Sequence, residues 1–320
     1  MENSINLGRI RRKTLMDDII KYIFLGITII SAMVIVVITI FISVKGITPF
    51  FKQYNVDGSL YRADFIKFIF GNTYFKYPNI YGAGYLIINT ILTTLLALVF
   101  AIPLSVLTAL FIAKIANKYV SKVINAAVEL LSSIPSVIYG LFGMAIITKI
   151  VNSISNFFHY QSAGGLSFLS VSIVLAIMIT PTITMISTTA IKAVKKDYVL
   201  GSLALGASTT QTNFKVVLVS AKSGIFSGII LGVGKALGEA TAISLVCGNR
   251  GNGPTFNPFD TTKTLTSAML QSIHESEGLS YDIRFSIGIL LIVIILVTNL
   301  ILNKVKNSIG EDNGKRKKQQ

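Results

Sequence analysis

The sequence predicts an all-α integral membrane protein with six transmembrane helices. Of its 320 residues, 52% are hydrophobic and only 13% are charged, and the mean hydropathy is +0.68. An ordinary soluble domain has a much more polar composition. In addition, six apolar runs are long enough to cross a hydrocarbon core of about 30 Å, which takes roughly 20 helical residues.

The first run, residues 22–44, lies between Lys21 and Lys45 and contains no charge. It is too long for the apolar part of a secretory signal peptide and no small-residue cleavage site follows it, so we expect an anchor helix that is retained. Five further runs are expected to form a helical core: 85–113, 123–148, 166–191, 223–247 and 285–303.

The distribution of Lys and Arg predicts the orientation, because these residues are retained on the cytoplasmic side. With the N-terminus inside, the inner segments carry nineteen of them in 78 positions and the outer segments nine in 94. Both termini are therefore expected in the cytoplasm. The net charge of +15 lies beside the apolar runs, so the expected partner of these charges is membrane lipid and not nucleic acid.

Catalysis by this chain is not expected. Its one cysteine, Cys247, excludes an internal disulfide, and its two histidines, His159 and His274, lie in separate outer segments and form no metal-ligand cluster. No set of nucleophile, base and orienting residue is evident. We therefore expect neither a bound metal nor a cofactor.

The chain divides into three parts. Residues 1–84 contain the N-terminal tail, the first helix and an outer segment; residues 85–303 form the core; and residues 304–320 form a basic tail. The inner connection 192–222 is apolar enough to need a soluble partner that covers it. Internal prolines in three runs, Pro103, Pro135 and Pro181, indicate kinks that serve either packing or a central cavity.

The stretch LGVGKALGEA (231–240) places Lys235 and Glu239 inside an apolar run. It fails the spacing of a phosphate-binding P-loop, because Ile229 stands where the first glycine must be and Ala236 follows the lysine. In a helix, Lys235 and Glu239 share a face, and two interpretations remain open: a structural ion pair, or a polar route for a substrate or ion. Three glycines continue this face and predict close packing with a neighbouring helix: Gly224, Gly228 and Gly232.

Three segments resemble a known family, the permease subunits of bacterial phosphate-specific ABC importers called PstC and PstA. VELLSSIPSVIYGLFG (128–143) resembles the family signature, and LALGASTTQTNFKVVLVSAKSGIFSGIILGVGKALGEA (203–240) resembles its coupling loop and charged helix. CGNRGNGPTFNPFDTTKTLTSAM (247–269) favours the PstC type over the PstA type. The signature residues are Glu129, Pro135, Ser136, Tyr139 and Gly140.

The resemblance implies an ABC importer type I permease core that translocates inorganic phosphate, while a separate pair of ATP-binding subunits hydrolyses ATP. A second, PstA-like permease and an extracytoplasmic phosphate-binding protein would complete the importer in the bacterial cell membrane. The coupling loop would contact the ATPase through Ala204, Leu205, Gly206 and Ala207. Alternatives are a permease for another oxyanion such as sulfate or molybdate, and an ion-coupled secondary transporter, which the long inner loop and the lack of evident inverted repeats disfavour.

The sequence departs from the family pattern at three places. Leu200 and Gly201 stand where the coupling loop usually begins with Glu-Ala, and Val219 replaces a usual proline. Lys235 stands at the position of an arginine. Because lysine is a point charge without the bidentate fork that suits phosphate, the implied contact would be less directional.

Overall fold

The computed structural model describes the backbone of residues 2–56, 58–75 and 79–318, and the side chains of residues 17–55, 58–75 and 79–308. Within these residues, six helices are long and apolar enough to span a membrane, which confirms the predicted class. The six spans are Asp17–Phe51, Gly84–Ile115, Ser136–Phe157, Phe168–Lys192, Thr209–Gly238 and Gly278–Ser308.

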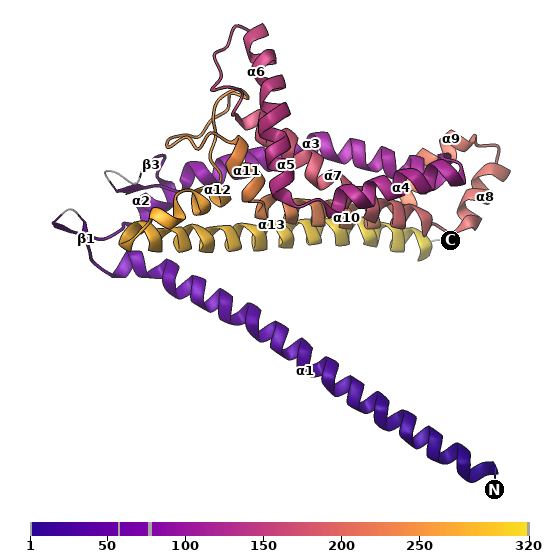
Figure 1. The fold of residues 1–320 in the computed structure, drawn as a ribbon. Coiled ribbons are helices and arrows are strands. Elements are labelled where there is room, and N and C mark those ends of the chain that lie inside the picture. The colour runs from indigo at the N-terminus through magenta and orange to yellow at the C-terminus, as the bar shows by residue number, and fades with distance from the viewer. Residues whose placement is uncertain (1, 57, 76–78, 319–320) are drawn as a thin grey trace.

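Four long helices run side by side and form the bundle: α3 (Gly84–Leu110), α7 (Phe168–Lys192), α10 (Leu218–Gly238) and α13 (Gly278–Lys318) (Figure 1). The central one is α7, which packs on both α3 and α10. Its most apolar stretch is 61% buried, more than that of any other described span. The core of the molecule therefore forms around α7.

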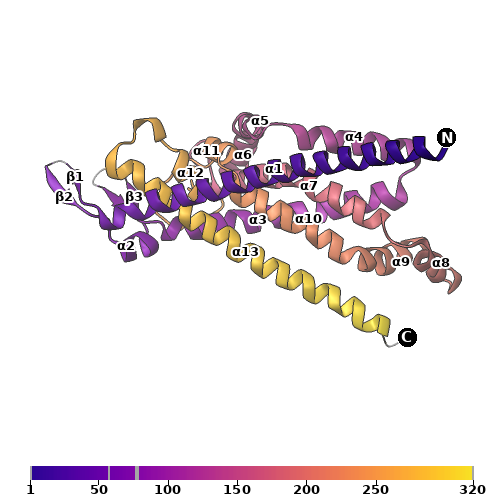
Figure 2. The same cartoon turned by 90° about the horizontal axis from the view of Figure 1, so that it is seen from below.

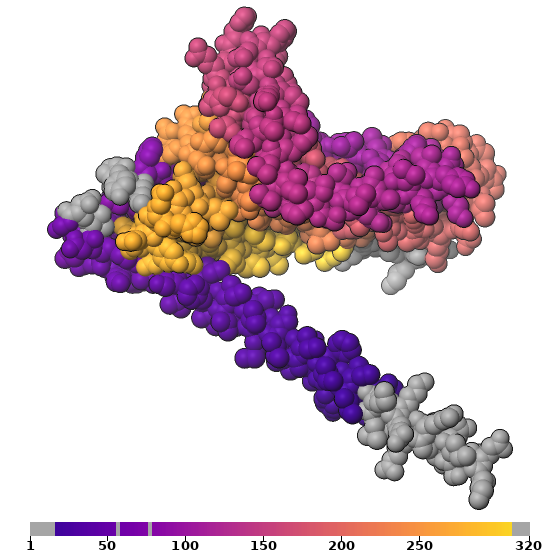
Figure 3. All heavy atoms as spheres, in the orientation of Figure 1, coloured from indigo at the N-terminus to yellow at the C-terminus, as the bar shows by residue number. Residues whose placement is uncertain are grey.

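The first helix, α1 (Glu2–Phe51), touches the bundle only near its C-terminal end, where it packs on α13. There a Cβ on Gly46 would lie 2.6 Å from the Phe285 carbonyl oxygen, so the two backbones are in contact. From Asp17 to its contact with α13, α1 stands away from the other atoms (Figures 1 and 3), and none of its most apolar stretch is buried. This arrangement agrees with an anchor helix outside the core.

Short elements cover the end of the bundle opposite to the C-terminus of α13 (Figures 1 and 2). They are β1 (Tyr54–Val56) paired with β2 (Ser59–Tyr61), α2 (Phe65–Phe70), β3 (Tyr74–Phe75) paired with β4 (Ile80–Tyr81), α12 (Leu265–Leu270) and the 3₁₀ helix η4 (Ile273–Glu275). We call the described residues of 54–83 (54–56, 58–75 and 79–83), together with residues 247–276, the cap. Four of its aromatic side chains are buried in one cluster with Ile283 and Ile287 of α13: Tyr54, Phe68, Tyr74 and Tyr81.

The expected helix over 123–148 is interrupted. It consists of α4 (Lys118–Ser133), α5 (Ser136–Phe142), the π-helix η2 (Gly143–Ile147) and α6 (Thr148–Phe157). Ile134 is extended, with φ −66° and ψ 128°, because a proline disfavours the helical region for the residue before it. Pro135 thus breaks this helix, whereas Pro103 and Pro181 stay inside α3 and α7. After the break α5 and α6 turn away from the bundle, and α6 projects from the surface (Figures 1 and 3).

The expected helix over 223–247 is also interrupted. It begins earlier, as α9 (Thr209–Thr212), the π-helix η3 (Asn213–Val217) and α10, and it ends at Gly238. Glu239 is extended, with φ −75° and ψ 124°, and a second short helix, α11 (Thr241–Val246), follows. No proline is involved here, so the sequence pattern gave no sign of this break.

The inner connection 192–222 is largely helical. It contains α8 (Lys196–Ala204), a turn and then α9, and the Ser202 and Thr212 hydroxyls lie 2.9 Å apart across this hairpin. At the end of α3 the chain passes through a further π-helix, η1 (Phe111–Ile115), before α4. Within the described backbone, α13 continues through the basic segment 304–320 as far as Lys318.

Candidate functional site

The two helix interruptions lie next to each other, because α5 packs on α11. Gly140 makes this approach possible: a Cβ at that position would lie 2.8 Å from the Ala242 Cα and 2.7 Å from a Leu245 methyl group. The break before Ser136 and the break at Glu239 are about 100 residues apart in sequence, and the contact between α5 and α11 brings them together in space.

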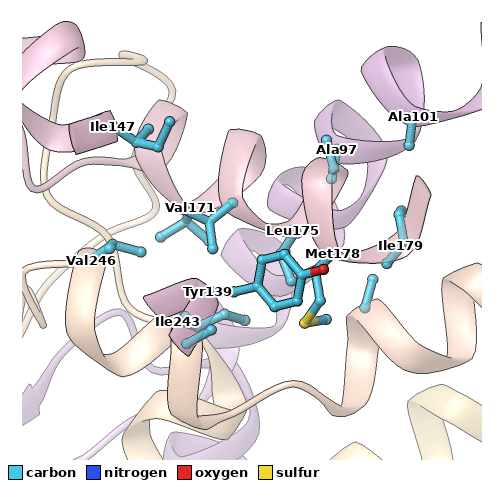
Figure 4. Close-up of a cluster of buried hydrophobic side chains, with 14 of the residues drawn as sticks. Ala97, Ala101, Tyr139, Ile147, Val171, Leu175, Met178, Ile179, Ile243 and Val246 are labelled. Atoms are coloured by element: carbon cyan, nitrogen blue, oxygen red, sulfur yellow. The ribbon is translucent and has the colours of Figure 1, made fainter. Parts of the chain in front are cut away.

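Tyr139 holds the first break. Its ring is buried in the core cluster with Ile243, Leu175 and Met178 (Figure 4), and its hydroxyl donates a hydrogen bond of 2.6 Å to the Leu131 carbonyl oxygen. That carbonyl belongs to the last turn of α4, where backbone oxygens have no partner within the helix. The side chain thus connects α4 to α5 across the interruption.

Lys235 lies in the last turn of α10 and is half-buried. Its Nζ donates to the Thr182 hydroxyl of α7 at 3.5 Å, directly after Pro181. Among the described side chains, no carboxylate oxygen lies within 4.0 Å of this Nζ. The ammonium group therefore carries a positive charge within a membrane span without a paired negative charge.

Of the two interpretations left open for Lys235 and Glu239, the structural ion pair is not formed, because the Glu239 carboxylate lies more than 4.0 Å from the Lys235 Nζ. That interpretation assumed a continuous helix, and α10 ends one residue before the glutamate. The Glu239 Oε1 instead accepts a hydrogen bond of 2.9 Å from the Ala242 backbone N–H at the start of α11. A side chain that caps free N–H groups in this way stabilises the new helix and, with it, the break.

The glycines of α10 occupy two different surroundings. A Cβ on Gly224 would lie 2.5 Å from the Ala190 Cβ, and one on Gly232 would lie 2.7 Å from Ile183, so these glycines, with Gly228 between them, allow α10 to lie against α7. A Cβ on Gly234 or Gly238 would meet no atom within 4 Å. The side of α10 that carries the second pair is open in this chain.

The residues expected to contact an ATPase form a tight turn at one end of the molecule. Ala204 ends α8, and Leu205, Gly206 and Ala207 lead into α9 (Figure 1). Gly206 has φ +82°, a left-handed conformation that glycine adopts without strain. Leu205 is 91% exposed, so a well-ordered turn presents an apolar side chain to its surroundings.

The remaining signature residues do not join Lys235. Pro135 makes the break, and Ser136 begins α5. Glu129 is exposed on α4 and makes no hydrogen bond or ion pair with any described residue. Sequence reasoning also missed Thr182, although the neighbouring Pro181 had marked this part of α7 as irregular.

The cap and the part of α13 next to it contain buried charges that the sequence did not single out. Lys263 is 3% exposed and its Nζ lies 4.7 Å from the centre of the Tyr74 ring, while desolvation lowers the pKa of its ammonium group to about 8. Arg284 is 7% exposed and donates to the carbonyl oxygens of Ala268 and Met269, each at 3.0 Å.

Asp260 organises the other side of the cap. Burial alone would raise the pKa of its carboxyl group, but hydrogen bonds from Tyr160 and Thr255 and the charge of Arg250 outweigh burial and lower it. Within the described residues, no three His, Cys, Asp or Glu side chains lie close enough together to hold a metal ion. Asp260 thus links Tyr160, Thr255 and Arg250 to one another.

Comparison with known proteins identifies the class. A family model described as the inner membrane component of binding-protein-dependent transport systems matches residues 101–309. The chain belongs to this family, and it is a permease subunit of an ABC importer.

Relatives and solved structures agree with this assignment. The chain is 35% identical over 260 residues to a probable ABC transporter permease of Bacillus subtilis, YqgH, covering 80% of each protein. It is 32% identical over 242 residues to the phosphate transport system permease protein PstC of Pasteurella multocida, covering 70% of this chain and 74% of that protein. An inward-facing structure of the MetNI methionine ABC transporter has the same fold, with a TM-score of 0.53, 15% identity, and coverage of 70% of this chain and 93% of that one.

Proposed function

We propose that this chain translocates inorganic phosphate as one of two permease subunits of an ATP-driven importer, and that Lys235 lies on the route of the anion. The observation that carries the proposal is the unpaired ammonium group of Lys235 beside two adjacent helix breaks. A charged group inside a membrane span is costly, and such groups mark substrate or ion routes. A positive charge attracts an anion, and similarity to PstC proteins favours phosphate.

The helix breaks support a route at this place. Irregular backbone at membrane depth is tolerated where it is buried in protein or lines a water-filled cavity. Glu239 is used as a cap of α11, so it leaves Lys235 free to interact with a substrate. The open side of α10 at Gly234 and Gly238 leaves room for that substrate beside the lysine.

The proposal includes the partners. A second permease would cover the open side of the bundle, an extracytoplasmic phosphate-binding protein would deliver the anion at the cap, and two ATP-binding subunits would bind the turn at Gly206. In this orientation both termini are cytoplasmic. ATP binding and hydrolysis would switch the route between its inward-open and outward-open states.

Uptake of labelled phosphate by cells that express the whole importer tests the role of Lys235. We expect Lys235→Ala to lower uptake by at least about tenfold, equivalent to 1.4 kcal/mol, and Lys235→Arg to keep most of it. The matched control is Lys149→Ala, which removes an exposed lysine of α6. Normal uptake by an assembled Lys235→Ala importer would exclude Lys235 from the route.

Competition identifies the anion. Sulfate, molybdate and arsenate are each added in excess during uptake of labelled phosphate. Strong competition by arsenate alone supports phosphate, because arsenate has the same charge and geometry. Transport of labelled sulfate or molybdate in place of phosphate would assign the chain to another oxyanion.

A further inference from the structure

The helix α4 has one polar side along its whole length. Seven of its residues carry charged, amide or hydroxyl groups and lie within an arc of about 120° around the helix axis, at 100° per residue. Apolar residues fill the opposite side. We call this side the polar face of α4; it consists of Lys118, Ser121, Lys122, Asn125, Glu129, Ser132 and Ser133.

The direction of α4 places this face at membrane depth. The helix runs alongside α7, from the α8–α9 end of the bundle to the break at Ile134 (Figures 1 and 2). It packs on α7, with Val128 buried. Ser121 binds the Ile112 carbonyl oxygen at 3.0 Å, which fixes the α8–α9 end of α4 to η1. An amphipathic helix at the membrane surface would instead lie across the bundle.

Lipid is an unsuitable neighbour for the polar face. Lys118, Lys122 and Glu129 are exposed in the chain, and a charged side chain in the hydrocarbon region costs on the order of 2.5 to 3.5 kcal/mol near its centre. A hollow of about 440 Å³ follows the face and is lined by Lys118, Ser121, Lys122, Asn125, Ala126 and Glu129. Water in such a hollow hydrates these groups.

The charges on the polar face favour an anion. Lys118 and Lys122 are four residues apart on one side of the helix, where like charges repel. No carboxylate among the described side chains lies within 4.0 Å of either ammonium group. An anion near this pair relieves the repulsion. Glu129 lies two turns further along, toward the break, and has no cationic partner within the described residues.

We propose that the polar face of α4 lines the water-filled passage between the helix breaks and the α8–α9 end, and that Lys118 and Lys122 give this part of the passage a positive potential for the anion. The proposal rests on the proposed transport function and extends it, because it assigns the part of the route beyond Lys235.

Thiol labelling tests the passage in the assembled importer. The buried Cys247 is first replaced by serine, and phosphate uptake is measured to verify this background. A cysteine then replaces Asn125 on the polar face, or Val123, which is 68% exposed on the apolar side two residues away, as the matched control. Membrane vesicles are treated with membrane-impermeant methanethiosulfonates of either charge, and co-purification of the partner subunits verifies assembly.

We expect Asn125→Cys to react and Val123→Cys to stay unreactive. At Asn125→Cys we also expect the positive local potential to raise the modification rate of the anionic reagent relative to that of the cationic reagent by about tenfold. The additional substitution Lys122→Gln should remove most of this preference. Equal reactivity of both cysteines, or none at Asn125→Cys, would overturn the passage. Reaction without anion preference would overturn the role of the lysines. These readouts do not depend on the substrate, so a failure of phosphate uptake in the background is seen separately.

Discussion

At the scale of single residues, hydrogen-bond partners decide what the charged side chains do. Lys235 was singled out by its place in an apolar run, and the structure adds that Thr182 is its polar neighbour. Glu239 was assigned to the same face, but it caps α11. Residue type and spacing revealed the unusual charge of Lys235, whereas the partner of this charge depended on the path of the backbone four residues further along, at Glu239.

Lys263 makes stability dependent on pH. Desolvation lowers the pKa of its ammonium group to about 8 in the folded chain, while an unfolded lysine titrates near pH 10.4. Between pH 8 and pH 10.4 the unfolded chain binds more protons than the folded chain, so the free energy of unfolding rises with pH. Below pH 8 this increase is absent, because both states are protonated. From pH 7.5 to 9.5 we expect wild type to gain about 2 kcal/mol relative to Lys263→Met.

Thermal unfolding of the purified chain in detergent measures this difference. Lys52→Met is the matched control, because Lys52 also lies over a tyrosine ring, 5.4 Å from the centre of Tyr54, but is exposed. The control and wild type should show the same dependence on pH. Parallel curves for wild type and Lys263→Met would show that the buried ammonium group does not titrate in this range.

At the scale of elements, apolar run length predicted the spans well and their continuity poorly. All six spans were found because about 20 apolar residues are needed to cross a membrane, whatever their contacts. Pro135 was expected to kink a helix, and it ends one. The break at Glu239 depends on packing of α11 against Gly140, a contact between distant parts of the chain that no local pattern contains.

The packing of α10 on α7 gives a prediction with an internal control. In Gly224→Ala the new methyl group would lie 2.5 Å from the Ala190 Cβ, so the helices must separate, at a cost of about 1–3 kcal/mol. Gly234→Ala meets no atom within 4 Å and improves helix propensity by up to about 1 kcal/mol. We expect a lower midpoint of thermal unfolding for the first variant and an unchanged or higher one for the second. The reverse order would contradict the assigned helix face.

At the scale of the whole molecule, the two ends of the bundle have different tasks. The cap is a folded layer with buried aromatic and charged side chains, whereas the α8–α9 end presents an exposed turn. The family resemblance had indicated this turn as a coupling site. Its conformation, with a left-handed Gly206, is information that only the structure supplies.

The turn should be sensitive to substitution without any clash. A Cβ at Gly206 would meet no atom within 4 Å, but a valine cannot adopt φ +82° without strain of about 1–2 kcal/mol, so the turn must change shape. We expect Gly206→Val to reduce phosphate uptake while the partner ATPase still hydrolyses ATP. Uptake and hydrolysis are measured together in proteoliposomes. Gly201→Val, in the exposed part of α8 with the same free space, is the control, and equal uptake by both variants would argue against a special role of the turn.

The break at Glu239 also gives the fifth span a mechanical property. From Thr209 to Gly238 the chain forms 30 consecutive helical residues, the π-helix η3 among them, about 45 Å long. This span starts beside the exposed turn and ends at the break. A rod of this length pivoting by about 5° at the α8–α9 end would displace its far end by roughly 4 Å. This displacement is similar to the 3.5 Å between the Lys235 Nζ and the Thr182 hydroxyl. A small rotation at one end of the molecule is thus enough to make or break that contact, while the short helix beyond the break stays in place on Gly140.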